Sequence, residues 1–203
     1  MKIIGLTGGI GNGKSFVARV AEKNFPILHI NTDEIARTQM QKGGKSFIRV
    51  VEEFSPLSDK LLNTDGEINR QELSRLVMAD RGLLDRLDEI THPAVIEEIK
   101  EIIEKEKASG RYSAVLIETA LIYEAGIDSI CDEVWYVYAP EGTRRRRLMT
   151  ERGYTQETID SFFMNQNPVE FFLSRADRTV PNGFDVTEKD MLEILSGYLM
   201  NME

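Results

Sequence analysis

The chain has 203 residues, of which 41% are hydrophobic, and its formal net charge is −9 at pH 7. This composition supports one compact core and argues against a disordered chain, and the acidic charge argues against a general nucleic-acid-binding protein. The single cysteine, Cys131, excludes an internal disulfide framework. The chain has neither a membrane-spanning apolar run nor a signal-peptide pattern. We therefore expect a cytoplasmic protein without nucleic-acid or membrane partners.

The apolar residues predict strands that alternate with helices along the chain. Short apolar runs indicate buried strands at residues 2–7, 26–30, 113–118 and 133–139, and a short last strand at residues 179–181. Helical spacing indicates helices at residues 15–23, from about residue 69, at residues 93–107 and from about residue 188. This alternation predicts an α/β fold with a parallel sheet that carries helices on both faces.

A glycine-rich segment, GGIGNGKS from Gly8 to Ser15, follows the first predicted strand and opens the first helix. Its pattern G-x-x-x-x-G-K-S in this context predicts a P-loop, in which backbone amides at a helix N-terminus bind a polyphosphate. Glycines let the backbone approach the phosphates closely. We expect Lys14 to reach the β- and γ-phosphates and the Ser15 hydroxyl to bind Mg²⁺. The alternative, a turn that only joins a strand to a helix, is disfavoured by the flanking elements.

The remaining sequence limits the class of P-loop protein. The N-K-x-D and D-x-x-G elements of switch GTPases are not found at suitable positions. A large ATPase would need a longer chain and an apolar strand that ends in Asp, whereas the third strand here ends in Glu118. These observations favour a small-molecule kinase.

Further segments, spaced in order along almost the whole chain, resemble the dephospho-CoA kinase family. They are GLTGGIGNGKS (5–15), INTDEIAR (30–37), DGEINRQEL (65–73), THPAV (91–95), TRRRRLM (143–149), Gln166 and ADRTVPNG (176–183). The resemblance implies a P-loop NTPase fold in one kinase domain, 1–203. Its parts would be a core at about 1–33, 111–140 and 177–203, a helical substrate-binding sub-domain at about 34–110 and a lid at about 141–176.

The resemblance also implies the reaction. The family uses ATP to phosphorylate the ribose 3′-hydroxyl of dephospho-CoA, the last step of coenzyme A biosynthesis. ATP and Mg²⁺ are the expected cofactors, with Mg²⁺ arriving with ATP, because two histidines and one cysteine far apart do not form a metal site. We expect a monomer or weak homo-oligomer. The alternatives are a nucleotide or nucleoside kinase and a non-catalytic nucleotide-binding switch.

Asp33 is the candidate catalytic base and a substrate contact. It follows the second strand, at the edge of the sheet where open α/β folds bind ligands. A carboxylate there can orient a ribose hydroxyl and accept its proton late in phosphoryl transfer. The alternative role for Asp33 is to cap a helix that begins at Glu34.

Four consecutive arginines, residues 144–147, are candidates for phosphate binding. On a helix their side chains spread over most of the circumference, so at least two should face solvent. The resemblance places a catalytic lid arginine at Arg147, or at Arg146 if the alignment slips by one residue, and a second lid arginine at Arg152. Their charge is expected to stabilise the transferring phosphoryl group.

The resemblance assigns the remaining site residues. The expected ATP contacts are Gly9, Gly11, Asn12, Gly13, Lys14, Ser15, Phe16 through its backbone, and Asn182 beside the adenine, although the segment at Asn182 can also be read as a plain turn.

Arg70 and His92 are expected to contact dephospho-CoA. For Arg70 the alternative is a surface cation, and for His92 it is a structural histidine at the start of the helix predicted from Pro93. A family motif after the third strand reads ETALIYE here, so either Glu118 or Glu124 lines the site, and His29 is expected in the core.

Overall fold

The computed structural model describes residues 1–199. They form two compact units: residues 1–30 together with the chain from Ser109 onward (unit 1), and residues 31–108 (unit 2). The predicted ends of the helical sub-domain, at about residues 34 and 110, lie close to the ends of unit 2.

Unit 1 is built on a five-stranded sheet in the order β2-β3-β1-β4-β5. The strands are β1 (Lys2–Thr7), β2 (Ile27–Asn31), β3 (Ala114–Glu118), β4 (Glu133–Tyr138) and β5 (Arg178–Pro181). β1 runs parallel to β3 and β4, and β4 runs parallel to β5. The five predicted strands are therefore confirmed, with ends that differ from the prediction by about one residue.

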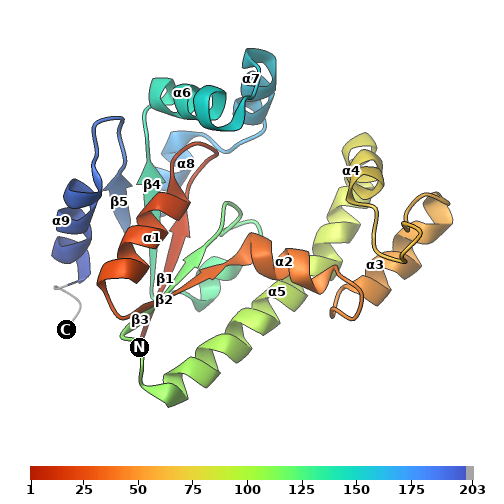
Figure 1. The fold of residues 1–203 in the computed structure, drawn as a ribbon, viewed down its shortest axis with the longest axis horizontal. Coiled ribbons are helices and arrows are strands. Elements are labelled where there is room, and N and C mark those ends of the chain that lie inside the picture. Colours follow the sequence, from red (N-terminus) through yellow and green to blue (C-terminus); the bar gives the residue numbers. More distant parts are fainter. Residues whose placement is uncertain (200–203) are drawn as a thin grey trace. The chain divides into compact units, whose positions relative to one another are not determined.

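Helices cover this parallel sheet, which gives the predicted α/β fold (Figure 1). One face of β1, with Ile4 and Leu6, shares a core with α1 (Lys14–Asn24) and α9 (Glu188–Leu199). The opposite face is close-packed at Gly5, where an added Cβ would lie 2.2 Å from Ile122 Cδ1. The other helices of unit 1 are η2 (Ile127–Ile130), α6 (Glu141–Arg152), α7 (Gln156–Met164) and α8 (Val169–Leu173).

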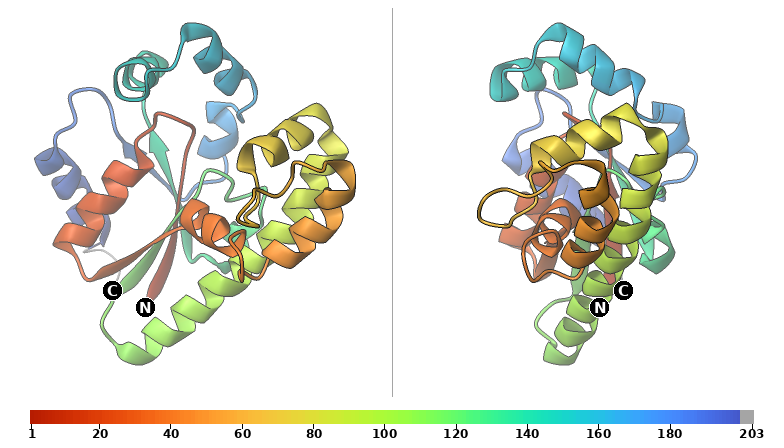
Figure 2. Two further views of the ribbon diagram at one scale, coloured as in Figure 1. Left: turned by 45° about the vertical axis from the view of Figure 1, so that its right-hand side comes forward. Right: turned by 90° about the vertical axis from the view of Figure 1, so that its right-hand side faces the viewer.

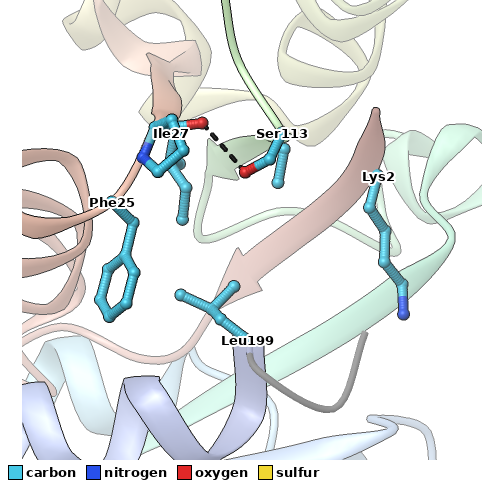
Figure 3. Close-up of a pocket in the computed structure, with 7 residues that line it drawn as sticks. Lys2, Phe25, Ile27, Ser113 and Leu199 are labelled. Atoms are coloured by element: carbon cyan, nitrogen blue, oxygen red, sulfur yellow. Dashed lines mark hydrogen bonds between the residues drawn. The ribbon is translucent and has the colours of Figure 1, made fainter. Parts of the chain in front are cut away.

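A small apolar cavity of about 210 Å³ lies at the end of the sheet where β1 and β3 begin (Figure 3). Phe25, Ile27 and Leu199 line it, and Ser113 Oγ donates a hydrogen bond to the carbonyl of Pro26 at 3.2 Å. The glycine-rich loop follows the opposite end of β1. This cavity is therefore separate from the predicted nucleotide site.

Unit 2 is helical, and its elements are α2 (Thr32–Gln39), α3 (Phe47–Phe54), η1 (Ser55–Leu57), α4 (Arg70–Ala79) and α5 (Arg81–Ser109) (Figure 2). A core of Val50, Phe54, Leu73, Leu76 and Ile90 joins α3, α4 and the first part of α5. The helix expected from about residue 69 is α4, and the Asn69 side chain caps it by accepting from the backbone N–H of Glu72.

The helix predicted at residues 93–107 is present as part of α5, but its predicted start at Pro93 is wrong. Pro93 lies inside α5, which runs without a break from Arg81 to Ser109. Proline is common at the first position of a helix, so the sequence favoured a start there. The helix continues through Pro93 because apolar residues on both sides of it, Ile90 before and Val95 and Ile99 after, are buried.

Among residues 1–199, no helix combines the length and the apolar character that crossing a membrane requires.

Candidate active site

The glycine-rich loop joins β1 to α1 and has the backbone conformation that its glycines permit. Gly11 and Gly13 have φ angles of 79° and 84°, in the left-handed region that favours glycine. Helix α1 begins at Lys14 without a side-chain cap, so the backbone N–H groups of its first turn face the loop. The Lys14 ammonium donates a hydrogen bond to the carbonyl of Gly8 at 2.7 Å. This arrangement is suited to an anion at the helix N-terminus.

Two predicted ATP contacts have structural roles within the loop. The N–H of Phe16 donates to the carbonyl of Gly13 at 3.0 Å, and the N–H of Asn12 donates to Gly9 at 3.2 Å. The Asn12 side chain is buried, and its Oδ1 accepts a hydrogen bond from the backbone of Ala139 after β4. In this conformation Asn12 and Phe16 hold the loop in shape.

Asn182, which follows β5, fixes the same loop from another side. It is buried, and its Nδ2 donates to the carbonyl of Asn12 at 2.7 Å. Its own backbone N–H bonds to Tyr138 at 2.7 Å. The segment at Asn182 is therefore attached to the P-loop, and its place beside the adenine stays a prediction.

Glu118 lies beside the loop, at the carboxyl end of β3. Its Oε1 accepts a hydrogen bond from Ser15 Oγ at 2.5 Å, and its Oε2 lies 2.9 Å from His29 Nε2 on β2. Burial favours a raised pKa for Glu118, but the hydrogen bonds from His29 and Ser15, with the charge of Lys14, lower it overall. Glu118 is therefore a carboxylate at neutral pH.

Of the two candidate glutamates, Glu118 is the one that contacts the loop. Glu124 is exposed, and its Oε1 accepts a hydrogen bond from Asn167. The expectation for His29 is wrong, because this side chain is 16% exposed and bonds to the carboxylate at the loop. A histidine within an apolar strand gave no sequence signal, since its partner comes 89 residues later.

Two of the four consecutive arginines contact the loop. Arg144 Nε donates to the carbonyl of Ile10 at 2.8 Å, and its Nη2 donates to Gln166 Oε1 at 2.7 Å. Arg147 lies one helical turn later, and its guanidinium donates to the carbonyls of Gly11 and Gly183 at 3.3 and 3.1 Å. Burial lowers the pKa of both guanidinium groups, which stay charged.

The other two arginines of this run have different partners. Arg145 forms ion pairs with Glu141 and Asp160 at 2.7 and 2.6 Å. Arg146 is exposed, and its guanidinium lies 3.7 Å from the ring centre of Phe184. The structure thus brings Arg147 rather than Arg146 to the loop. It also adds Arg144, which the sequence did not single out among the four consecutive arginines.

Three of the predicted substrate residues, Asp33, Arg70 and His92, belong to unit 2. Asp33 is the second residue of α2 and is exposed. The helix cap is Asn31, whose Oδ1 accepts from the N–H groups of Asp33 and Glu34 at 3.0 and 3.4 Å. The alternative in which Asp33 caps this helix is therefore wrong, and its carboxylate remains available for another role.

The other predicted substrate contacts lie at exposed or half-buried positions. Arg70 Nη2 donates to the carbonyl of Arg37 at 3.0 Å. His92 lies in the middle of α5, with Nε2 at 3.5 Å from Asp88 Oδ1. Arg152 is the exposed last residue of α6 in unit 1.

The oxygen atoms near the loop fit Mg²⁺. The Ser15 hydroxyl and the Glu118 carboxylate are hard oxygen donors, the ligand type that Mg²⁺ prefers. Within residues 1–199, no group of three or more His, Cys, Asp and Glu side chains could hold a metal ion. A Mg²⁺ ion at Ser15 would therefore take most of its ligands from nucleotide phosphates and water, as is usual for this ion.

Comparison with known proteins identifies the family to which this site belongs. The family model described as dephospho-CoA kinase matches residues 2–188. A dephospho-CoA kinase of Carboxydothermus hydrogenoformans is 35% identical over 198 residues, which cover 96% of this chain and 93% of the relative. A similar protein of Corynebacterium diphtheriae, also named dephospho-CoA kinase, is 36% identical over 97% of this chain and 94% of its own.

Solved structures agree in fold. The Thermus thermophilus protein TT1252 has a TM-score of 0.77 at 27% identity, and the comparison covers 100% of this chain and 98% of that chain. A dephospho-CoA kinase from Campylobacter jejuni has a TM-score of 0.72 over the same shares at 23% identity. With the family match over nearly the whole length, these findings lead to one conclusion: the chain belongs to the dephospho-CoA kinase family.

Proposed function

We propose that this protein transfers the γ-phosphoryl group of ATP to the 3′-hydroxyl of the ribose in dephospho-CoA, which yields coenzyme A. The family assignment supports the acceptor. The main support for ATP as the phosphoryl donor is the loop from Gly8 to Ser15. This loop ends at the uncapped N-terminus of α1, beside the Glu118 carboxylate. The expected cytoplasmic location and oligomeric state stay predictions.

The P-loop residues hold the donor. Backbone amides at the start of α1 and the Lys14 ammonium bind the phosphates of ATP, and the Ser15 hydroxyl is a ligand for Mg²⁺. At Ser15 the ion would supply positive charge that offsets the negative charge developing between the β- and γ-phosphates. Asn12 and Asn182 keep the loop in the conformation that this requires, because each bonds to another element of unit 1.

Asp33 orients the acceptor. A ribose hydroxyl is a weak nucleophile, and a carboxylate that accepts its hydrogen bond directs the oxygen at the γ-phosphorus and takes the proton late. Asp33 follows Ile30 by three residues, so chain length alone keeps the two Cα atoms within about 11 Å. Asp33 therefore stays close to the carboxyl end of β2, the type of position at which α/β sheets bind ligands.

The arginines of α6 add positive charge near the loop. Arg147 and Arg144 are charged and half-buried, and each also bonds to backbone carbonyls of the loop. In the proposed mechanism their charge stabilises the phosphoryl group during transfer. Arg152, Arg70 and His92 are proposed to contact the acceptor.

A direct assay tests the proposal. The protein is incubated with ATP, Mg²⁺ and dephospho-CoA, and the 3′-phosphorylated product is identified by mass spectrometry. Nucleoside monophosphates, nucleosides and an acceptor-free sample serve as comparisons. Product from dephospho-CoA alone supports the assignment. Transfer to nucleotides or nucleosides instead indicates the kinase alternative, and nucleotide binding without transfer to any acceptor indicates a switch.

A further inference from the structure

Glu118 lies between two elements that each approach one of its oxygen atoms. In the sheet, β3 lies between β2 and β1. From the β1 side, Ser15 at the start of α1 contacts Oε1 at 2.5 Å. From the β2 side, His29 Nε2 contacts Oε2 at 2.9 Å. Only 7% of the Glu118 side chain is exposed, so these two contacts define the orientation of its carboxylate.

The direction of both hydrogen bonds follows from the charge of Glu118. An ionised carboxylate only accepts hydrogen bonds, so Ser15 and His29 must both donate. The proton of the Ser15 hydroxyl therefore points at Glu118, and its lone pairs point away from it. A hydroxyl in this orientation presents lone pairs to a cation. The imidazole proton is fixed on Nε2 for the same reason.

We propose that His29 is a positioning residue for Mg²⁺, because its hydrogen bond to Oε2 of Glu118 holds Oε1 where it orients the Ser15 hydroxyl towards the metal. The inference rests on the proposed function, since it assumes that Ser15 binds the Mg²⁺ that accompanies ATP. His29 would thus act on the metal through Glu118 and Ser15.

Loss of the His29 donor has two consequences. The terminal torsion of a glutamate side chain is soft, so a carboxylate held at only one oxygen can rotate. A buried carboxylate oxygen without a donor is also unfavourable, so Glu118 would turn towards other donors. In both cases Ser15 loses its fixed acceptor. Substitutions of residues that orient metal ligands typically lower metal affinity by roughly 10–100-fold.

A matched pair of variants separates this role from general stability. In His29→Gln, the side-chain amide can reach the position of Nε2 and donate to Glu118, whereas in His29→Asn it is too short to do so. Leu28→Ala is the control for damage to β2, because successive side chains of a strand point to opposite faces. ATP binding is measured by calorimetry at a series of Mg²⁺ concentrations and in EDTA, without dephospho-CoA.

The expected result is that His29→Asn needs roughly 10-fold more Mg²⁺ for half-maximal tightening of ATP binding. Its ATP affinity in EDTA, like the Mg²⁺ response of His29→Gln and Leu28→Ala, should stay close to wild type. An unchanged Mg²⁺ response in His29→Asn overturns the inference, and so does an equal loss of affinity with and without Mg²⁺. A wild-type protein that binds no ATP at any Mg²⁺ concentration overturns the proposed function itself.

A second measurement needs no variant. The chain has two histidines, so ¹⁵N-histidine labelling gives resonances from His29 and His92 alone. Addition of Mg²⁺ to the ADP-bound protein should shift the Nε2 resonance of His29 and leave that of His92 in place. A His29 resonance that does not respond to Mg²⁺ contradicts the inference, even if the His29→Asn variant fails to fold.

Discussion

Glu133, at the start of β4, allows a quantitative prediction about the stability of unit 1. Its Oε1 accepts a hydrogen bond from Lys2 Nζ at 2.6 Å, and its Oε2 accepts from Trp135 Nε1 at 2.9 Å and Arg178 Nε at 3.0 Å. Only 16% of the Glu133 side chain is exposed. Glu133→Gln keeps the size of the side chain but places an amide NH₂ group against at least one of these donors.

The expected loss follows from these contacts. Hydrogen bonds to charged groups contribute about 1.5–3 kcal/mol, but Lys2 and Arg178 can regain water because each is about 30% exposed. We therefore expect the free energy of unfolding to fall by about 2 kcal/mol at pH 7. For a chain of this size, that lowers the melting temperature by about 4–8 °C.

The pH dependence has a defined sign. Burial favours a raised pKa for Glu133, but hydrogen bonds from Arg178, Lys2 and Trp135 lower it from 4.5 to about 2. A carboxylate with a lowered pKa stabilises the folded state above its unfolded pKa, and this contribution is lost as the pH falls through the folded pKa. The difference between wild type and Glu133→Gln should therefore be full at pH 6–7 and shrink from pH 4.5 towards pH 2.

Urea unfolding followed by circular dichroism at pH 7, 5, 4 and 3 measures this difference. Glu188→Gln is the control, because Glu188 pairs with Lys23 at 2.6 Å while more than half of each side chain is exposed. We expect its effect to stay within about 0.5 kcal/mol. The reasoning is refuted if the difference in the free energy of unfolding between wild type and Glu133→Gln does not change between pH 7 and pH 3. It is also refuted if Glu188→Gln lowers the free energy of unfolding as much as Glu133→Gln does.

Three further predictions concern the site and the cysteine. Asp33→Asn should lower turnover at least about 100-fold while ATP affinity measured by calorimetry stays unchanged; full turnover would exclude the role as base. Gly13→Ala should lower ATP affinity at least about 10-fold, because φ is 84° and the new Cβ would lie 2.3 Å from Asn182 Nδ2. Gly126→Ala, with φ of 69° and open space around it, is the control and should keep that affinity. Burial raises the pKa of Cys131 to about 12, so iodoacetamide at pH 8 should modify the native thiol at least about 100-fold more slowly than free cysteine, and a comparable rate would contradict its burial.

The sheet was predictable because its strands are buried on both faces. Segments such as Ala114–Glu118 and Glu133–Tyr138 are nearly continuous apolar runs, which a parallel sheet covered by helices requires. The P-loop was predictable for a related reason. Its chemistry depends on a short contiguous pattern, so the local sequence contains almost all of the information.

The helix around Pro93 and the cap of α2 show where local rules fail. Proline favours a helix start, but burial on both sides of Pro93 keeps α5 continuous. Asn31 and Asp33 are both good capping residues, and the sequence does not show which of them has the required extended backbone. Asn31 has φ and ψ of −99° and 112°, and therefore caps the helix.

The contacts around Glu118 and among the arginines depend on pairing between distant segments. His29 meets Glu118 only because β2 and β3 are neighbours in the sheet. Arg144 and Arg147 reach the loop because their side chains share one face of α6, one turn apart. The sequence contains these residues, but the strand order and the helix orientation determine their partners.

The position of β1 in the sheet has a consequence for synthesis of the protein. Lys2 pairs with Ala114 on one side, and Ile4 pairs with Glu133 on the other. At typical elongation rates of about 5–20 residues per second, roughly 5–20 s pass between the synthesis of β1 and that of β3, its first partner strand. During this time an apolar strand with two unpaired edges is a target for chaperones or for aggregation. The P-loop is held by Ala139 after β4 and by Asn182 after β5. We therefore expect a nucleotide to stabilise only a nascent chain that has already extended beyond β5.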